Sequence, residues 1–150
     1  MKKIHFLIPF ALFLIACGSA TPPPPVIAGL GEVFTLTSGQ SAKIEDTDMT
    51  ITLVGVPGDE RCPLDIECVE SGPVTVAVTI QSGSDAPEEF TFQSFTDNDG
   101  SVPEMDFEGM TAGIEVNGFA IRLKSVLPFP QYSTSEIRPD DYRVSFIVTR

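Results

Sequence analysis

The residues whose type and spacing allow the most definite chemistry are the three cysteines, Cys17, Cys62 and Cys68. Cys62 and Cys68 lie a few residues apart, in a segment that is too short for a stable helix. A zinc site needs four ligands, and redox-active pairs usually have only two residues between the cysteines. The spacing therefore favours a structural disulfide over a redox pair or a metal site, and it indicates an oxidising compartment.

Cys17 has a different environment, because it directly follows an apolar segment. Residues 4–16 are apolar except for His5 and Pro9, and they are too few to span a bilayer as a permanent helix. The run ends in Leu14-Ile15-Ala16-Cys17, which resembles a bacterial lipobox. The sequence thus predicts a lipoprotein signal peptide at 1–16 and a diacylglyceryl group, with palmitate-type chains, on Cys17. An ordinary secretory signal or a short membrane anchor is the alternative.

The segment after Cys17 predicts a spacer followed by one domain. Four consecutive prolines prevent a helix and sheet pairing, so residues 17–31 are expected to form an extended linker. Residues 32–150 are expected to form a single domain. The net charge is −12, with 21 acidic and 9 basic residues, which disfavours binding to nucleic acid or anionic lipid headgroups. The predicted lipid, and not surface charge, would therefore hold the protein on a membrane.

Hydrophobic residues alternate with polar ones with a period of two, which predicts β-strands. Seven strands are expected, at 34–37, 42–45, 50–53, 74–81, 90–93, 119–124 and 142–149, with an eighth candidate at 112–116. Strands with one apolar face must bury it against a second sheet or close on themselves. The sequence therefore predicts an all-β fold, either an antiparallel β-sandwich or a partly open barrel.

The composition argues against catalysis. The only histidine is His5, inside the predicted signal, so the mature chain lacks the commonest general base and metal ligand. No glycine-rich phosphate loop is present. We therefore expect a protein that is not an enzyme and holds no metal or cofactor. A hydrolase that uses paired carboxylates is the alternative.

Two loops attract attention because long loops often carry function. In the first loop, the acidic residues from Asp97 to Glu108 match part of the spacing of a calcium-binding loop. Val102, however, occupies the position where that loop needs glycine. A solvated turn is expected there, and a calcium-assisted enzyme is the alternative. In the second loop, Phe129 and Tyr132 lie near prolines and are candidate anchors for a binding partner. Their alternative role is to cap the core.

The segment around the paired cysteines resembles a group of small bacterial lipoproteins and secreted β-domains with an Arg-Cys-Pro…Cys loop motif. The matching residues are Asp59-Glu60-Arg61-Cys62-Pro63, Ile66-Glu67-Cys68 and Val69-Glu70-Ser71-Gly72, followed by a valine-rich strand. The resemblance extends to Pro128-Phe129-Pro130 and Arg138-Pro139-Asp140-Asp141-Tyr142 before the last strand. It departs at Glu70, where the group usually has tryptophan. It implies a β-fold and an exported location, and no activity.

These features together predict an exported lipoprotein with a binding or structural role in the cell envelope. The lipid would anchor it in the cell membrane or the outer membrane, with the domain on the extracytoplasmic side. Its partner would be an envelope protein or polymer. A protease-inhibitor-like role of the loop closed by Cys62 and Cys68 is a further alternative, although Asp65 and Glu67 would suit few proteases.

The lipid anchor can be tested at Cys17. We expect the wild-type protein to fractionate with membranes and to show the mass of a diacylglyceryl-modified N-terminal cysteine. The Cys17→Ser variant should lose both properties, because the thioether requires the thiol. Wild-type protein without lipid mass, or a variant that remains on membranes as before, would contradict the prediction.

Overall fold

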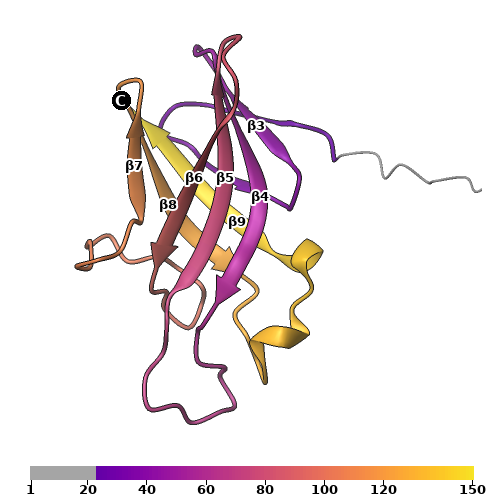
Figure 1. The fold of residues 1–150 in the computed structure, drawn as a ribbon, viewed down its shortest axis with the longest axis vertical. Coiled ribbons are helices and arrows are strands. Elements are labelled where there is room, and N and C mark those ends of the chain that lie inside the picture. The colour runs from indigo at the N-terminus through magenta and orange to yellow at the C-terminus, as the bar shows by residue number, and fades with distance from the viewer. Residues whose placement is uncertain (1–22) are drawn as a thin grey trace, which may run out of the picture.

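The computed structural model describes residues 23–150, which form nine β-strands in two facing sheets (Figure 1). The strands are β1 (Val26–Ala28), β2 (Val33–Leu36), β3 (Ser41–Ile44), β4 (Met49–Asp59), β5 (Val74–Ser82), β6 (Glu88–Ser94), β7 (Gly113–Val116), β8 (Phe119–Leu127) and β9 (Arg143–Thr149). Two short 3-10 helices, η1 (Thr134–Glu136) and η2 (Pro139–Asp141), precede β9. The predicted signal peptide and Cys17 lie outside the described residues.

The two sheets form a β-sandwich, which confirms the predicted fold class. One sheet has five strands in the order β1-β3-β4-β5-β6, and the other has four in the order β2-β9-β8-β7. All pairs are antiparallel except β1–β3, which is parallel. The eight expected strands are present, and β1 is an addition that lies in the segment expected to be linker. Its three residues are too few to show a period in the sequence.

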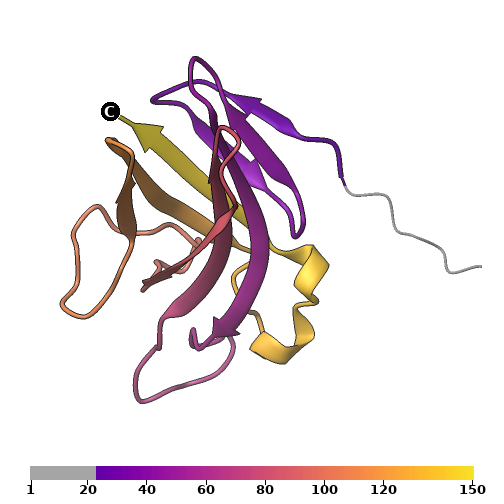
Figure 2. The same ribbon diagram turned by 45° about the horizontal axis from the view of Figure 1, so that its top comes forward.

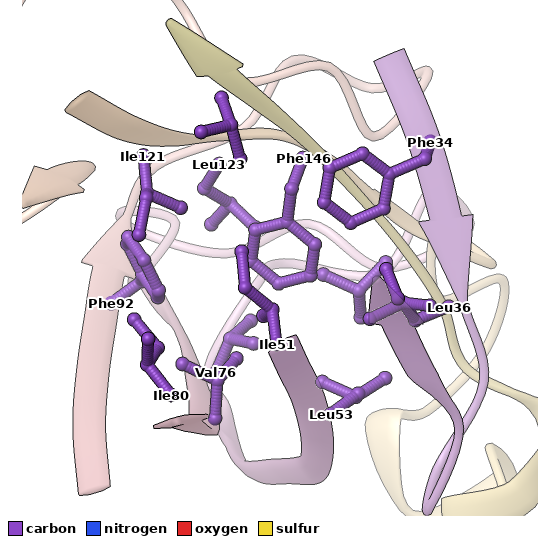
Figure 3. Close-up of a cluster of buried hydrophobic side chains, with 14 of the residues drawn as sticks. Phe34, Leu36, Ile51, Leu53, Val76, Ile80, Phe92, Ile121, Leu123 and Phe146 are labelled. Carbon is purple, nitrogen blue, oxygen red and sulfur yellow. The ribbon is translucent and has the colours of Figure 1, made fainter. Parts of the chain in front are cut away.

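The core lies between the sheets and consists of the alternate side chains that the sequence pattern identified. Phe146 from β9 is fully buried at its centre, with ring centroids 6.0 Å from Phe34 and 5.6 Å from Phe92 (Figure 3). Apolar side chains from β4, β5 and β8 surround these rings. A single continuous core of this kind fixes the register of each strand, since a slip by one residue would expose every buried side chain.

Two long connections lie at the same end of the sandwich. The β4–β5 connection spans residues 60–73 and projects from the bottom of the molecule in Figures 1 and 2. The β8–β9 connection, which contains η1 and η2, lies beside it. Cys62, Cys68 and both predicted aromatic anchors belong to these two connections. Within residues 23–150, no helix is long and apolar enough to cross a membrane.

Candidate functional site

The β4–β5 connection is closed by a disulfide between Cys62 and Cys68, with the two Cα atoms 6.0 Å apart, which confirms the predicted pairing. The base of the loop is held by backbone hydrogen bonds from Glu60 to Pro73 O (3.0 Å) and from Gly72 to Glu60 O (2.9 Å). The Cys62 N–H donates to the Ser71 hydroxyl (3.0 Å). The loop is therefore fixed at its base and again at its middle.

Gly72 is needed at this base. A Cβ atom at this position would lie 2.5 Å from Glu60 Cβ and 2.8 Å from the Glu60 carbonyl oxygen. Backbone atoms cannot move away from such a contact without breaking the hydrogen bonds between the two loop arms. The glycine of the sequence motif thus has a packing role.

Arg61 precedes the first cysteine and is buried, with 2% of its surface exposed. Its Nε and Nη2 atoms donate to the two carboxylate oxygens of Asp59, at 2.8 and 2.6 Å. Nη1 donates to Val126 O at 2.7 Å, and Nη2 also donates to Pro128 O at 2.9 Å. The guanidinium carbon lies 5.0 Å from the centroid of the Phe129 ring. A buried arginine is tolerated only when its charge and donors are matched in this way.

Tyr142 completes this buried network from the end of the β8–β9 connection. Its hydroxyl donates to Asp59 Oδ2 at 2.9 Å. Burial, with a further contribution from the Asp59 charge, raises the pKa of the Tyr142 phenol well above its ordinary value. The phenol therefore stays a neutral donor, and Asp59 accepts hydrogen bonds from both Arg61 and Tyr142.

The two connections also pair directly through their backbones. Leu64 N–H donates to Pro130 O at 3.1 Å, and Asp65 N–H donates to Gln131 O at 3.0 Å. The Gln131 side-chain amide donates to the Asp65 carboxylate at 2.5 Å. The tip of the disulfide loop is thus attached to the β8–β9 connection and forms one surface with it.

Four exposed apolar side chains belong to these two connections. Leu64 and Ile66 are each 48% exposed, Tyr132 is 60% exposed, and Val69 is completely exposed. We call these four residues the loop-end surface. The exposed carboxylates of Asp65, Glu67 and Glu70 lie between and beside them in the sequence. Exposed apolar residues that alternate with acidic ones are found at interaction surfaces, although single exposed apolar residues are common.

The two predicted anchors have different environments. Tyr132 is exposed and belongs to the loop-end surface. Phe129 is only half-exposed, and its ring packs against the Arg61 guanidinium. Phe129 therefore supports the buried network, and a partner could reach only part of it.

Sequence reasoning missed the buried network. The i, i+2 spacing of Asp59 and Arg61 at a strand end places both side chains on one face, but the motif by itself does not predict that they pair. The alternation predicts Tyr142 as the first residue of the last strand, whereas β9 begins at Arg143 and the Tyr142 hydroxyl joins the network. The signal that could have revealed the network is an acid and an arginine directly before a cysteine in an otherwise polar loop. No local pattern could have joined them to Val126 and Pro128.

The 97–111 segment combines local turns with backbone pairing to β8, where the Val102 N–H donates to Lys124 O at 2.8 Å. The Asp97 N–H donates to Ser101 O (2.8 Å), and Asp99 Oδ1 accepts from the Ser101 N–H (2.9 Å). This local hydrogen bond lowers the pKa of Asp99. Val102 is buried, and Phe107 packs edge-on against Phe95 at 5.3 Å. In residues 23–150 no three acidic, histidine or cysteine side chains are placed to hold a metal ion.

Carboxylates also line two surface hollows. Asp106 and Glu115 lie at a hollow of about 440 Å³ on the β7–β8 side, where Asp106 is ion-paired with Arg122 at 2.9 Å. Asp46, Asp48 and Asp85 line another of about 530 Å³ at the opposite end from the disulfide loop. All of these acids are exposed, and none has the desolvated setting of a general acid.

The fold and its loop end define the chain as a disulfide-containing β-sandwich. A scan of protein-family models and searches of curated proteins and solved structures found no match to this chain. Any function must therefore be argued from the site itself.

The buried network predicts a large loss of stability for Arg61→Met. This change leaves the Asp59 carboxylate buried without its cation, so the free energy of unfolding should fall by about 3–5 kcal/mol. Chemical denaturation measures this loss. The double variant Asp59→Asn/Arg61→Met should lose less than the sum of the two single changes, because the two residues form one interaction. Additive losses would contradict the network.

The phenol of Tyr142 predicts a pH dependence. The folded state binds its proton more tightly than the unfolded chain, so this stabilisation is complete below about pH 10 and is lost as the pH rises further. Tyr142→Phe should cost about 1–3 kcal/mol at pH 7 and should lose less stability than wild type above about pH 10. At pH 7, the exposed control Tyr132→Phe should change stability by less than about 0.5 kcal/mol. If the stability of wild type and of Tyr142→Phe depended equally on pH, the buried phenol would not be the source of this pH dependence.

Proposed function

We propose that this protein is an exported lipoprotein that acts by binding and not by catalysis, and that the loop-end surface contacts its partner. The observation that carries the proposal is the exposure of Leu64, Ile66 and Val69 on a loop that is fixed by a disulfide and a buried network. A fixed loop loses little conformational entropy when it binds, so its apolar contacts contribute fully to affinity.

The proposed location is the extracytoplasmic face of the cell membrane or outer membrane, with Cys17 as the lipid attachment site. The lipobox-like sequence supports it, and the disulfide agrees with an oxidising compartment. The described chain starts in the upper half of Figure 1, whereas the disulfide loop projects from the bottom. A domain tethered through its N-terminus could therefore present this loop away from the membrane.

The chemistry of the loop-end surface favours a particular kind of partner. An envelope protein with an apolar patch bordered by Lys or Arg would cover Leu64, Ile66 and Val69 and would meet the nearby carboxylates. Nucleic acid would be repelled by the net charge. Binding should therefore weaken as salt concentration rises, since the basic border of the partner is screened.

The loop-end surface is tested by photo-crosslinking in the cells that produce the protein. A photoreactive residue at Val69 should give one dominant protein adduct, and Leu64→Ser/Ile66→Ser should abolish it. Val54 on β4 is similarly exposed at 50% and serves as the control position. Ile27→Ser/Val33→Ser is the matched control variant, since Ile27 and Val33 are also exposed and lie away from the loop. Both double variants should retain wild-type stability within about 1 kcal/mol.

The same adduct at Val54, or an adduct that survives the loop double variant, would refute the loop-end surface as the binding site. Turnover of a substrate by the purified protein, lost when one carboxylate is replaced, would refute the non-enzymatic role.

A further inference from the structure

Among residues 23–150, the edge strand β6 has backbone groups without a partner. The Gln93 N–H and C=O exchange two hydrogen bonds of 3.0 Å with Thr111, so they point away from β5. The β5–β6 register is unbroken, and orientation along a strand repeats every two residues. The N–H and C=O groups of Glu89 and Thr91 therefore point the same way as those of Gln93. In the described part of the chain, neither residue has a backbone partner on that side.

Beside β6 there is a seam between the edges of the two sheets. β7 is the edge of the other sheet on the same side of the molecule (Figure 1). Phe90 from β6 and Ile114 and Val116 from β7 are only partly buried and pack against the core from the two edges. A cavity of about 130 Å³ is lined by Glu88 and Phe90 from β6 and by Val116 from β7. The core is thus incompletely covered along this seam.

Acidic side chains surround the open edge. Glu88 and Glu89 on β6, Asp85 in the preceding turn and Glu115 on β7 are all exposed, and no ion pair involves them within residues 23–150. Two copies of β6 placed edge to edge would bring these like charges together, which is unfavourable. Charged residues on an edge strand also protect against aggregation. The charge therefore favours a basic strand over a second copy of this chain.

We propose that β6 binds an extended basic peptide segment of a partner protein by β-strand addition. The segment would pair with the free backbone groups of Glu89 and Thr91 and extend the five-stranded sheet by one strand. Its alternate apolar side chains would enter the seam and cover Phe90 and Val116, and its Lys or Arg side chains would face Glu89. Gln93 and Thr111 already make one such pair at the lower end of this edge. The proposal does not depend on the loop-end surface.

A synthetic peptide with alternating Lys and Val residues tests the proposal, with the full-length lipidated protein in detergent. We expect saturable binding by calorimetry and at least tenfold slower hydrogen exchange at the Glu89 and Thr91 amides, since both become hydrogen-bonded. A peptide of the same sequence, N-methylated on the edge that would face β6, has the same charge and should not bind.

Variants of Thr91 distinguish strand pairing from charge attraction. Thr91→Pro removes an N–H that is not hydrogen-bonded to β5, and edge strands tolerate such a change. This variant should bind the peptide at least tenfold more weakly. Thr91→Val keeps the N–H and should bind within twofold of wild type. Glu88→Lys/Glu89→Lys should also weaken binding at least tenfold, whereas Leu64→Ser/Ile66→Ser should not change it.

Equal binding of the N-methylated peptide, or equal binding by Thr91→Pro, would overturn the proposal and show charge attraction alone. A dimer in sedimentation that Thr91→Pro abolishes would show that a second copy occupies the edge, and would also overturn it. Absence of peptide binding at low salt would identify the acidic edge as a protection against aggregation only.

Discussion

The buried guanidinium of Arg61 is the constraint on which the loop end of this sandwich depends. Its donors reach the Asp59 carboxylate at the end of β4, Val126 O in β8 and Pro128 O just after that strand. It thus joins one sheet to the other where the hydrophobic core ends. An apolar side chain could fill the same volume, but it would leave Val126 O and Pro128 O without these donors. Only Arg offers several donors in one rigid plane.

The disulfide and this ionic network restrain different parts of the loop. The disulfide restrains residues 62–68 within the loop, and its contribution for such a short loop is about 2–3 kcal/mol on the chain-entropy model. It does not determine where the loop lies relative to the sandwich. That position comes from Arg61, from Tyr142 and from the backbone pairing of Leu64 and Asp65 with the β8–β9 connection. Loss of the disulfide should therefore loosen the tip more than the base.

The sequence predicted the parts of this structure that depend on local pattern. Alternation located eight strands because each presents one face to the core, and the cysteine spacing predicted the bridge between Cys62 and Cys68. The short strand β1 was not predicted, because three residues are too few to show an alternation of apolar and polar side chains. It forms through parallel pairing with β3. The network of Arg61, Asp59 and Tyr142 was not predicted, because it joins residues that lie far apart in the chain. The packing of the Phe129 ring against Arg61 was not predicted for the same reason, because nothing in the local sequence indicates this contact.

The point where the described chain begins lies away from the two proposed binding surfaces. Pro24 O accepts a hydrogen bond of 2.9 Å from the Gln40 side chain, so the described chain begins attached to the turn between β2 and β3. The β4–β5 connection, which carries three residues of the loop-end surface, lies at the bottom of Figure 1, away from this entry. The open edge of β6 lies along the side formed by β6 and β7. A partner with both a basic extended segment and an apolar patch could engage the two together, and linkage would then make its affinity higher than either contact gives alone.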